Sequence, residues 1–318
     1  METFYATLNP MLVMFFCILV GYLLNKTHVC PENTGTVLSK LETYCLMPAI
    51  GFSTMATYCR PESLAQRGPG LLYGALATGL SVALAYPLAR LFAKKGYEKN
   101  VYRYALAFAN HGFMGNAVVE ALFGSAFLFE YMFLRLPGET VTFLWGLPQL
   151  IPKEKRQSPW RILLNPPLLG ILGGILVGLT GLVDHLPTAL MSGVTNLSKC
   201  MGPVAMVLTG FIMAQYRLGD LLKNKKVYAI SALRLVALPA LICLAMYLLG
   251  ARGNVLLLTM VFTAMPLGLN TVVFPATYGG DPSIGAGMSL VSTTLCTLTF
   301  PLMVALYHLL GFSLPAFA

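Results

Sequence analysis

The sequence LAFANHGFMGNAVV at residues 106–119 decides how this chain folds. It lies inside a long apolar segment, yet it contains two asparagines, one histidine and two glycines. A membrane helix tolerates such a cluster only where its polar groups and its loosened backbone face protein or a water-filled cavity. We therefore expect an interrupted helix at this point.

A second stretch, FTAMPLGLNTVV at residues 262–273, repeats part of the first. Four positions carry the same residue at an offset of 154, and the pairs are Phe108 and Phe262, Asn116 and Asn270, Val118 and Val272, and Val119 and Val273. Two interrupted apolar segments at corresponding places in two halves of a chain indicate the binding site of a transporter.

The composition indicates a membrane protein. The 318 residues are 57% hydrophobic and only 10% charged, whereas soluble domains carry about 25% charged residues. The net charge of +9 lies in short gaps between apolar segments, which fits cytoplasmic loops and not a nucleic-acid partner. The seven cysteines show no metal-ligand spacing and no disulfide framework, and we expect no metal and no cofactor.

A span requires roughly 17–25 apolar residues, and on that basis the chain divides into ten. They cover residues 8–25, 37–57, 69–93, 101–123, 126–150, 162–182, 187–213, 226–249, 254–279 and 283–311. The fold class is thus an all-α polytopic membrane protein. We expect a first five-helix repeat at 1–152, a short cytoplasmic linker at 153–161 and a second five-helix repeat at 162–318.

The distribution of basic residues between the gaps predicts how these spans are oriented in the membrane. The gaps after odd-numbered spans contain most of the basic residues, namely Lys26, Lys40, Arg90, Lys94, Lys95, Lys99, Arg103, Lys153, Lys155, Arg156, Arg161, Arg217, Lys223, Lys225 and Lys226. The opposite gaps contain only Arg60, Arg67 and Arg252. Because cytoplasmic loops are enriched in Lys and Arg, both termini are expected outside a plasma or inner membrane.

The repeat extends beyond the two central stretches. Leu8-Asn9-Pro10 recurs as Leu164-Asn165-Pro166, and Tyr73 recurs as Tyr228. Leu38-Ser39-Lys40 recurs as Leu197-Ser198-Lys199, although the proline that follows, Pro48 or Pro203, is displaced by about one turn. Spans one to five then correspond to spans six to ten. Because five is odd, the second half enters the membrane inverted, as in many secondary transporters.

The two central stretches provide the candidate binding residues. Pro266 removes a backbone donor and opens its helix, and Gly112 and Gly115 weaken theirs. The half-helix that follows such a break presents a positive N-terminus to an anion, and asparagine amides can donate to a carboxylate. We assign the site to Asn110, His111, Gly115, Asn116, Arg135, Met265, Pro266, Gly268 and Asn270.

Several of these residues have a simpler structural explanation. The asparagines can tie broken backbone together, and His111 is either a proton carrier near neutral pH or a structural hydrogen-bonding residue. Arg135, near the middle of span five, is either a cation for the solute or the partner of Glu130 or Glu139, because an unpaired arginine there costs about 2.5–3.5 kcal/mol.

The other charged residues in or near the spans are expected to be structural. Arg234 is close enough to the cytoplasmic end of its span to reach the interface. Glu42, Lys40 and Lys199 are expected at the interface. Glu120 and Glu130 flank the outer gap and are either solvated span ends, which we favour, or residues of a vestibule.

Three motifs resemble the auxin efflux carrier family, which includes the plant PIN proteins and bacterial malonate and malate permeases. They are NHGFMG at residues 110–115, MPLGLNTVVF at 265–274 and YGGDP at 278–282. The resemblance covers essentially the whole chain. It implies a ten-helix fold related to sodium/proton antiporters and bile acid symporters, with spans four and nine broken and crossing at mid-membrane. It also implies elevator-type movement of spans 3–5 and 8–10 against spans 1, 2, 6 and 7, and a homodimer.

One difference from the family concerns the first crossing. PIN-like sequences tend to place a proline after the glycine in span four, whereas this chain has Asn116-Ala117. We therefore expect Gly112, Gly115 and Asn116 to unwind that span without a proline.

The function expected from these features is secondary transport of a small organic anion, a mono- or dicarboxylate, in the lipid bilayer. A proton or sodium ion is the candidate coupling ion. Enzymatic motifs are absent from the sequence, so an intramembrane enzyme is disfavoured. A carrier of another solute, such as an amino acid or a sterol-like molecule, and a transporter-fold receptor without turnover remain alternatives.

Overall fold

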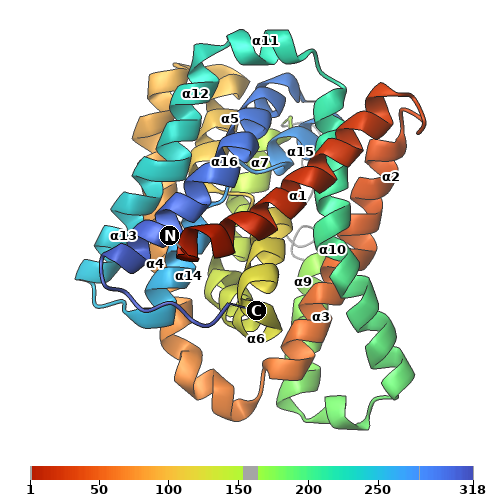
Figure 1. The fold of residues 1–318 in the computed structure, drawn as a ribbon, viewed down its shortest axis with the longest axis vertical. Helices are drawn as coiled ribbons and strands as arrows, with labels where there is room; N and C mark the ends of the chain where they lie inside the picture. Colours follow the sequence, from red (N-terminus) through yellow and green to blue (C-terminus); the bar gives the residue numbers. More distant parts are fainter. Residues whose placement is uncertain (1, 153–163, 279, 318) are drawn as a thin grey trace.

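The computed structural model describes residues 2–152, 164–278 and 280–317, and every regular element within them is a helix (Figure 1). The first half contains α1 (Glu2–Lys26), α2 (Thr34–Leu41), η1 (Glu42–Leu46), α3 (Met47–Tyr58), α4 (Pro61–Phe92), α5 (Gly96–Ala107), η2 (His111–Gly115), α6 (Asn116–Val141), η3 (Thr142–Gly146) and α7 (Leu147–Leu150). The expected linker at 153–161 lies outside the described residues.

The second half contains a comparable series of helices. They are α9 (Pro166–Leu179), η5 (Leu182–His185), α10 (Thr188–Ala214), α11 (Leu218–Lys223), α12 (Lys225–Ala232), η6 (Leu233–Ala237), α13 (Leu238–Leu248), α14 (Gly253–Ala264), α15 (Asn270–Tyr278) and α16 (Ser283–Leu309).

Within the part of the chain that the structure describes, six helical runs are long and apolar enough to cross a membrane. They cover Thr3–Lys26, Arg67–Phe92, His111–Leu150, Thr188–Ala214, Lys225–Leu248 and Ser283–Leu309, and two shorter apolar helices cover Pro166–Leu179 and Gly253–Ala264. The prediction of a polytopic all-helical membrane protein is therefore confirmed.

The longest run, His111–Leu150, is not one straight rod. Gly124 has φ 78° and ψ 174° inside it, a conformation outside the helical region, so the chain changes direction there. Only glycine adopts this backbone conformation without strain. The part before Gly124 follows the first interruption, and the part after it carries Arg135.

Two helices are interrupted at a common point near the centre of the protein. Residues 108–110 separate α5 from η2, and residues 265–269 separate α14 from α15. Ala109 and Leu267 form an antiparallel bridge, and the Asn110 N–H donates to the Pro266 carbonyl at 2.8 Å. The two broken backbones thus satisfy part of each other's hydrogen bonding, which buried backbone requires where water is absent.

The expectation that Gly112, Gly115 and Asn116 unwind the first of these helices is wrong. Gly112 and Gly115 lie in the wide helical turn η2, and Asn116 begins α6, so none of them is unwound. The break lies just before them, at residues with little sequence signal, because the chain there pairs with residues 266 and 267 instead of continuing α5.

Two charged residues are also more deeply placed than expected. Glu42 is fully buried rather than interfacial, and neither of its carboxylate oxygens has a hydrogen-bond partner among the described residues. Arg234 does not reach the interface, because η6 turns it into the core, where its Nη1 donates to the Leu106 carbonyl at 3.0 Å. Leu106 lies in the last turn of α5, whose carbonyl end favours a cation.

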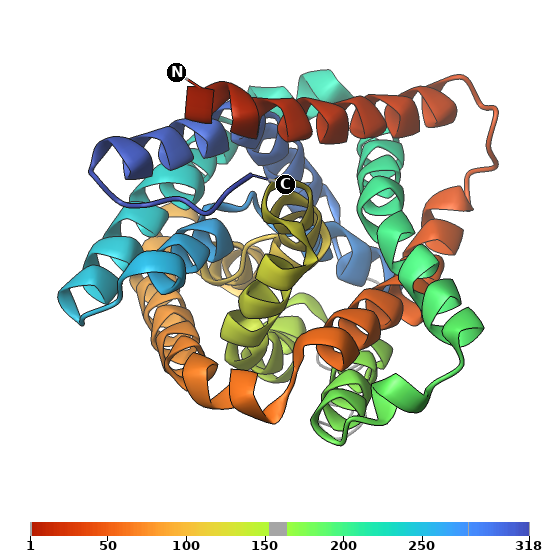
Figure 2. The ribbon, with the colours of Figure 1, turned by 60° about the horizontal axis from the view of Figure 1, so that its bottom comes forward.

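Two pairs of helices, α1 with α10 and α3 with α9, pack closely because glycines let their backbones approach. In the α1–α10 pair, a Cβ at Gly21 would lie 1.9 Å from the Val207 carbonyl oxygen, and one at Gly210 would lie 1.8 Å from the Ile18 carbonyl oxygen. In the α3–α9 pair, a Cβ at Gly174 would lie 2.6 Å from the Phe52 carbonyl oxygen. Such backbone approach through small residues is typical of membrane helix interfaces. In Figure 2, α1 (dark red) runs across the top of the view and α10 (green) reaches it from the lower right.

Candidate binding site at the crossing of the broken helices

A cavity of about 340 Å³ adjoins the interrupted backbones, and we call it the crossover cavity. Its lining comes from five regions of the chain, namely Thr43, Tyr44 and Met47; Ala109 to Phe113; Glu139, Thr142, Phe143 and Leu147; Leu164 to Pro167; and Asn270 and Phe274. Ligand cavities are typically about 300–1,000 Å³. This cavity lies at the small end of that range.

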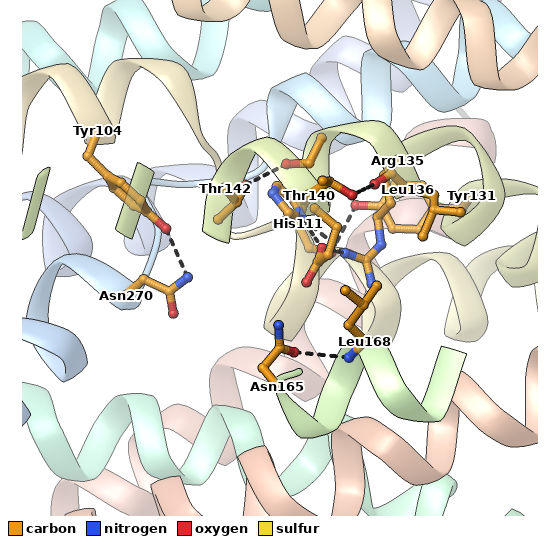
Figure 3. Close-up of polar contacts among 12 residues, drawn as sticks. Tyr104, His111, Tyr131, Arg135, Leu136, Thr140, Thr142, Asn165, Leu168 and Asn270 are labelled. Carbon is orange, nitrogen blue, oxygen red and sulfur yellow. Dashed lines mark hydrogen bonds and ion pairs between the residues drawn. The ribbon is translucent and has the colours of Figure 1, made fainter. Parts of the chain in front are cut away.

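Three helices that follow non-helical backbone begin at the crossover cavity. Residues 110–113 are the start of η2, Asn270 is the first residue of α15, and Asn165 is the N-cap of α9. Because each helix N-terminus carries a partial positive charge, all three favour an anion in the space between them. Figure 3 shows Asn165, Asn270 and His111 approaching this region from three separate elements.

The start of η2 supplies hydrogen-bond donors as well as a dipole. The backbone N–H groups of His111, Gly112 and Phe113 have no partner among the described residues, and all three residues line the cavity. The α9 terminus contributes no comparable donors, because Pro166 and Pro167 lack an N–H and the Leu168 N–H is already bound by the Asn165 Oδ1 at 3.0 Å. Free N–H groups at a helix start are typical of sites that bind anions.

Asn270 is held in place across the cavity. Its Nδ2 donates to the Tyr104 hydroxyl at 2.9 Å, and Tyr104 is buried in α5, on the other broken helix. The bond joins the start of α15 to α5. One amide hydrogen and the amide oxygen of Asn270 are left to contact a solute.

A buried charge cluster of His111, Arg135 and Glu139 lies at one wall. The guanidinium of Arg135 donates to the Glu139 carboxylate, and its Nη1 lies 3.2 Å from the His111 Nδ1. Because arginine is only a donor, the His111 Nδ1 acts as the acceptor, which places the ring hydrogen on Nε2. His111 and Glu139 line the cavity, whereas Arg135 does not and is 2% exposed. The structure thus has the ion pair with Glu139 that was one of the two explanations for Arg135.

The remaining predicted site residues lie behind the cavity wall. Gly115, Asn116, Met265, Pro266 and Gly268 are buried, and none of them lines the cavity. The Asn116 Oδ1 is buried without a hydrogen-bond partner among the described residues. Asn110, His111 and Asn270 are the predicted residues that the fold brings together at the cavity.

Gly115 has an evident packing role. A Cβ at this position would lie 2.1 Å from the Tyr131 hydroxyl oxygen, which donates to the His111 carbonyl at 3.0 Å. Absence of a side chain at Gly115 therefore lets Tyr131 support the start of η2.

The sequence did not identify several residues of the site. Asn165 was visible only as part of the repeated Leu-Asn-Pro motif, and its position at the cavity supplies the functional reason to single it out. Tyr104, Tyr131 and Thr142 are common residue types in membrane helices, and nothing in their local sequence distinguishes them. Only the three-dimensional arrangement brings them to the broken helices.

Comparisons with known proteins agree with this architecture. The sequence matches the membrane transport protein family over residues 6–142 and 150–304. It is 25% identical to an uncharacterised transporter of Methanocaldococcus jannaschii over 93% of this chain and 97% of that protein. It is also 24% identical to an uncharacterised transporter of Methanothermobacter thermautotrophicus over 94% of this chain and 98% of that protein.

These matches confirm the resemblance noted in the motifs, and the family and both relatives are transporters, not enzymes. The protein therefore resides in a lipid bilayer and acts on a transported solute. On the match over nearly its whole length, the chain belongs to the membrane transport protein family of the auxin efflux carriers.

Proposed function

We propose that this protein is a secondary transporter of a small organic anion, a mono- or dicarboxylate, which binds in the crossover cavity. The observation that carries the proposal is the set of N–H groups of His111, Gly112 and Phe113, unpartnered among the described residues, which open onto a cavity where three helices begin. Carboxylate oxygens are suitable acceptors for those groups.

The charged residues at the cavity are compatible with an anion. Glu139 would repel a carboxylate if it were alone, but Arg135 pairs with it directly. The cluster of Arg135, Glu139 and a neutral His111 has no net charge, so the helix N-termini and the amides of Asn110 and Asn270 determine the preference for an anion.

We further propose that the chain crosses the membrane ten times as two inverted five-helix repeats, at 1–152 and 162–318. The helical runs 34–58 and 225–248, the turn at Gly124 and the breaks at 108–110 and 265–269 support this division. Both termini would face the outside of a plasma or inner membrane, from the distribution of basic residues. The crossover cavity then opens toward the cytoplasmic half, because its lining lies near residues 40, 150 and 165.

Transport would follow an elevator scheme in which α4 to α7 and α12 to α16 move against α1, α2, α3, α9 and α10. The close glycine-mediated packing of α1 with α10 and of α3 with α9 supports a rigid scaffold. A homodimer through this scaffold and coupling to a proton or sodium ion are part of the same proposal.

Counterflow in proteoliposomes tests the proposal. Vesicles containing purified protein and loaded with unlabelled propionate, lactate, malonate or succinate should take up the labelled form of the transported anion. Asn270→Ala should lower the rate at least about tenfold, since it removes an amide donor from a buried site, whereas Asn33→Ala, at an exposed position before α2, should leave it unchanged. Binding without counterflow would indicate a receptor, and exchange of neutral solutes only would contradict an anion carrier.

A further inference from the structure

A second cavity, of about 600 Å³, lies between α1, α6 and α10, which all contact one another. We call it the second cavity. It is lined by Asn9, Pro10, Val13, Met14 and Cys17 of α1, by Ala117, Glu120 and Ala121 of α6, and by Lys199, Gly202, Pro203 and Met206 of α10. It shares no lining residue with the crossover cavity.

The two cavities are built from corresponding parts of the internal repeat. Asn9-Pro10 lines the second cavity, and its counterpart Asn165-Pro166 lines the crossover cavity. Glu120 occupies the position equivalent to Phe274 at the offset of 154, and each lines its own cavity. In a chain with inverted halves, such counterparts face opposite sides of the membrane.

The charge of Lys199 favours water over lipid as the content of the second cavity. Lys199 lies eleven residues after the first residue of α10, about 16 Å along the helix. That position is near the middle of a hydrocarbon core of about 30 Å, deeper than the interfacial position expected from the sequence. An ammonium facing lipid at that depth costs about 2.5–3.5 kcal/mol. The side chain is exposed, lines the cavity and makes no ion pair within 4 Å among the described residues, and its charge attracts that of Glu120 across the cavity.

The opposite charge in the second cavity limits what it can attract. Glu120 also lines it and accepts a hydrogen bond from the Ser125 Oγ at 3.3 Å. One ammonium and one carboxylate on the walls of the same cavity suit a solute with a single carboxylate. A second carboxylate on the solute would meet Glu120.

We propose that the second cavity is the outward-facing entry site of the transport pathway, where Lys199 binds the carboxylate of the solute and Glu120 selects monocarboxylates over dicarboxylates. This inference rests on the proposed function. It assigns recognition on the outer side to α1, α6 and α10, and recognition on the cytoplasmic side to the three helix N-termini of the crossover cavity.

The test measures KM separately from each side of the membrane, with labelled propionate and malonate, in right-side-out and inside-out vesicles. Lys199→Gln should raise the outer KM for propionate at least about tenfold, the usual effect of losing a charge-assisted hydrogen bond, and leave the cytoplasmic KM unchanged. Lys199→Arg should stay close to wild type. Glu120→Gln should lower the outer KM for malonate relative to propionate. Lys40→Gln is the control, because Lys40 ends the other copy of the Leu-Ser-Lys motif and lines neither cavity.

A readout independent of turnover uses Cys17, which lines the second cavity. A membrane-impermeant methanethiosulfonate added outside should label wild type more than Cys17→Ser, and propionate should slow that labelling in wild type but not in Lys199→Gln. Equal changes in KM on both sides, or labelling of Cys17 only from the cytoplasmic side, would overturn the inference. Failure of the wild-type protein to exchange any carboxylate would instead refute the proposed function.

Discussion

The Tyr131 hydroxyl donates to the His111 carbonyl at 3.0 Å by passing through the space that a side chain at residue 115 would occupy. The bond connects the part of α6 after Gly124 with the start of η2, so it fixes the half-helix whose N–H groups open onto the crossover cavity. The absence of a side chain at Gly115 thus makes room for the Tyr131 hydroxyl, and the two residues together support the start of η2.

Gly115→Ala should destabilise the protein clearly. The added methyl would overlap the Tyr131 oxygen, and overpacking of this kind costs about 1–3 kcal/mol. The melting temperature in detergent should fall, and adding Tyr131→Phe should recover part of the loss, because the overlapping oxygen is then absent. Gly79→Ala is the matched control, since nothing lies within 4 Å of a Cβ there, and it should be neutral or slightly stabilising. Equal effects of the two alanine substitutions would contradict this explanation.

Arg135→Met should be more harmful than removal of the whole ion pair. Arg135 and Glu139 are both almost fully buried, and a buried carboxylate left without its cation costs about 3–5 kcal/mol. The double variant Arg135→Met with Glu139→Met should therefore be more stable than Arg135→Met alone in thermal or denaturant unfolding. For comparison, Lys226→Met breaks the exposed pair with Glu98 and should change stability by less than about 1 kcal/mol. A single variant as stable as the wild type would show that Arg135 is not needed to neutralise Glu139.

His111→Gln should leave the pH profile of transport unchanged, although it lowers the rate. The His111 Nδ1 accepts from a permanently charged guanidinium at 3.2 Å, and a proton on that nitrogen would break the bond and place two cations side by side. The amide oxygen of glutamine can replace the acceptor. Initial rates of exchange between about pH 5.5 and about pH 8, a range that brackets the ordinary pKa of histidine, check this prediction. A profile that loses its pH dependence in the variant would instead assign proton coupling to His111.

Asp184→Asn should destabilise the protein only at pH values at which Asp184 is ionised, because it removes the ion pair with Arg60 that connects the ends of α3 and α9. Arg60 binds both oxygens of Asp184 at 3.0 Å, and this bond holds the pKa of the Asp184 carboxyl below its ordinary value. A lowered pKa in the folded state stabilises the protein above the unfolded pKa of about 3.9 and loses that effect as the pH falls through the folded value.

The difference in melting temperature between wild type and Asp184→Asn should therefore be present at neutral pH and decline below about pH 4. Because both side chains are exposed, high salt should reduce it. A difference that grows on acidification would be inconsistent with the ion pair.

The sequence by itself determined the class of protein and the location of its centre. The low charge and the long apolar segments indicate a membrane protein, because a lipid bilayer accepts only apolar surfaces and a backbone whose hydrogen bonds are made internally. The polar residues at 110–116 and the proline at 266 identified the two stretches that meet, and their shared offset along the chain was enough to pair them. Asn110, His111 and Asn270 were identified in the same way, since polar groups inside an apolar helix require a partner or a cavity.

Only the tertiary structure decided where the first helix breaks and which side chains face the cavity. Residues 108–110 lack glycine and proline, and they leave the helix because Leu267 and Pro266 offer an alternative set of backbone partners. Pairing of this kind joins segments more than 150 residues apart, so no local pattern can encode it. For the same reason Arg135 turned toward Glu139, Arg234 toward the end of α5, and Asn165 toward the crossover cavity. The direction of each side chain depends on neighbours that the fold alone brings together.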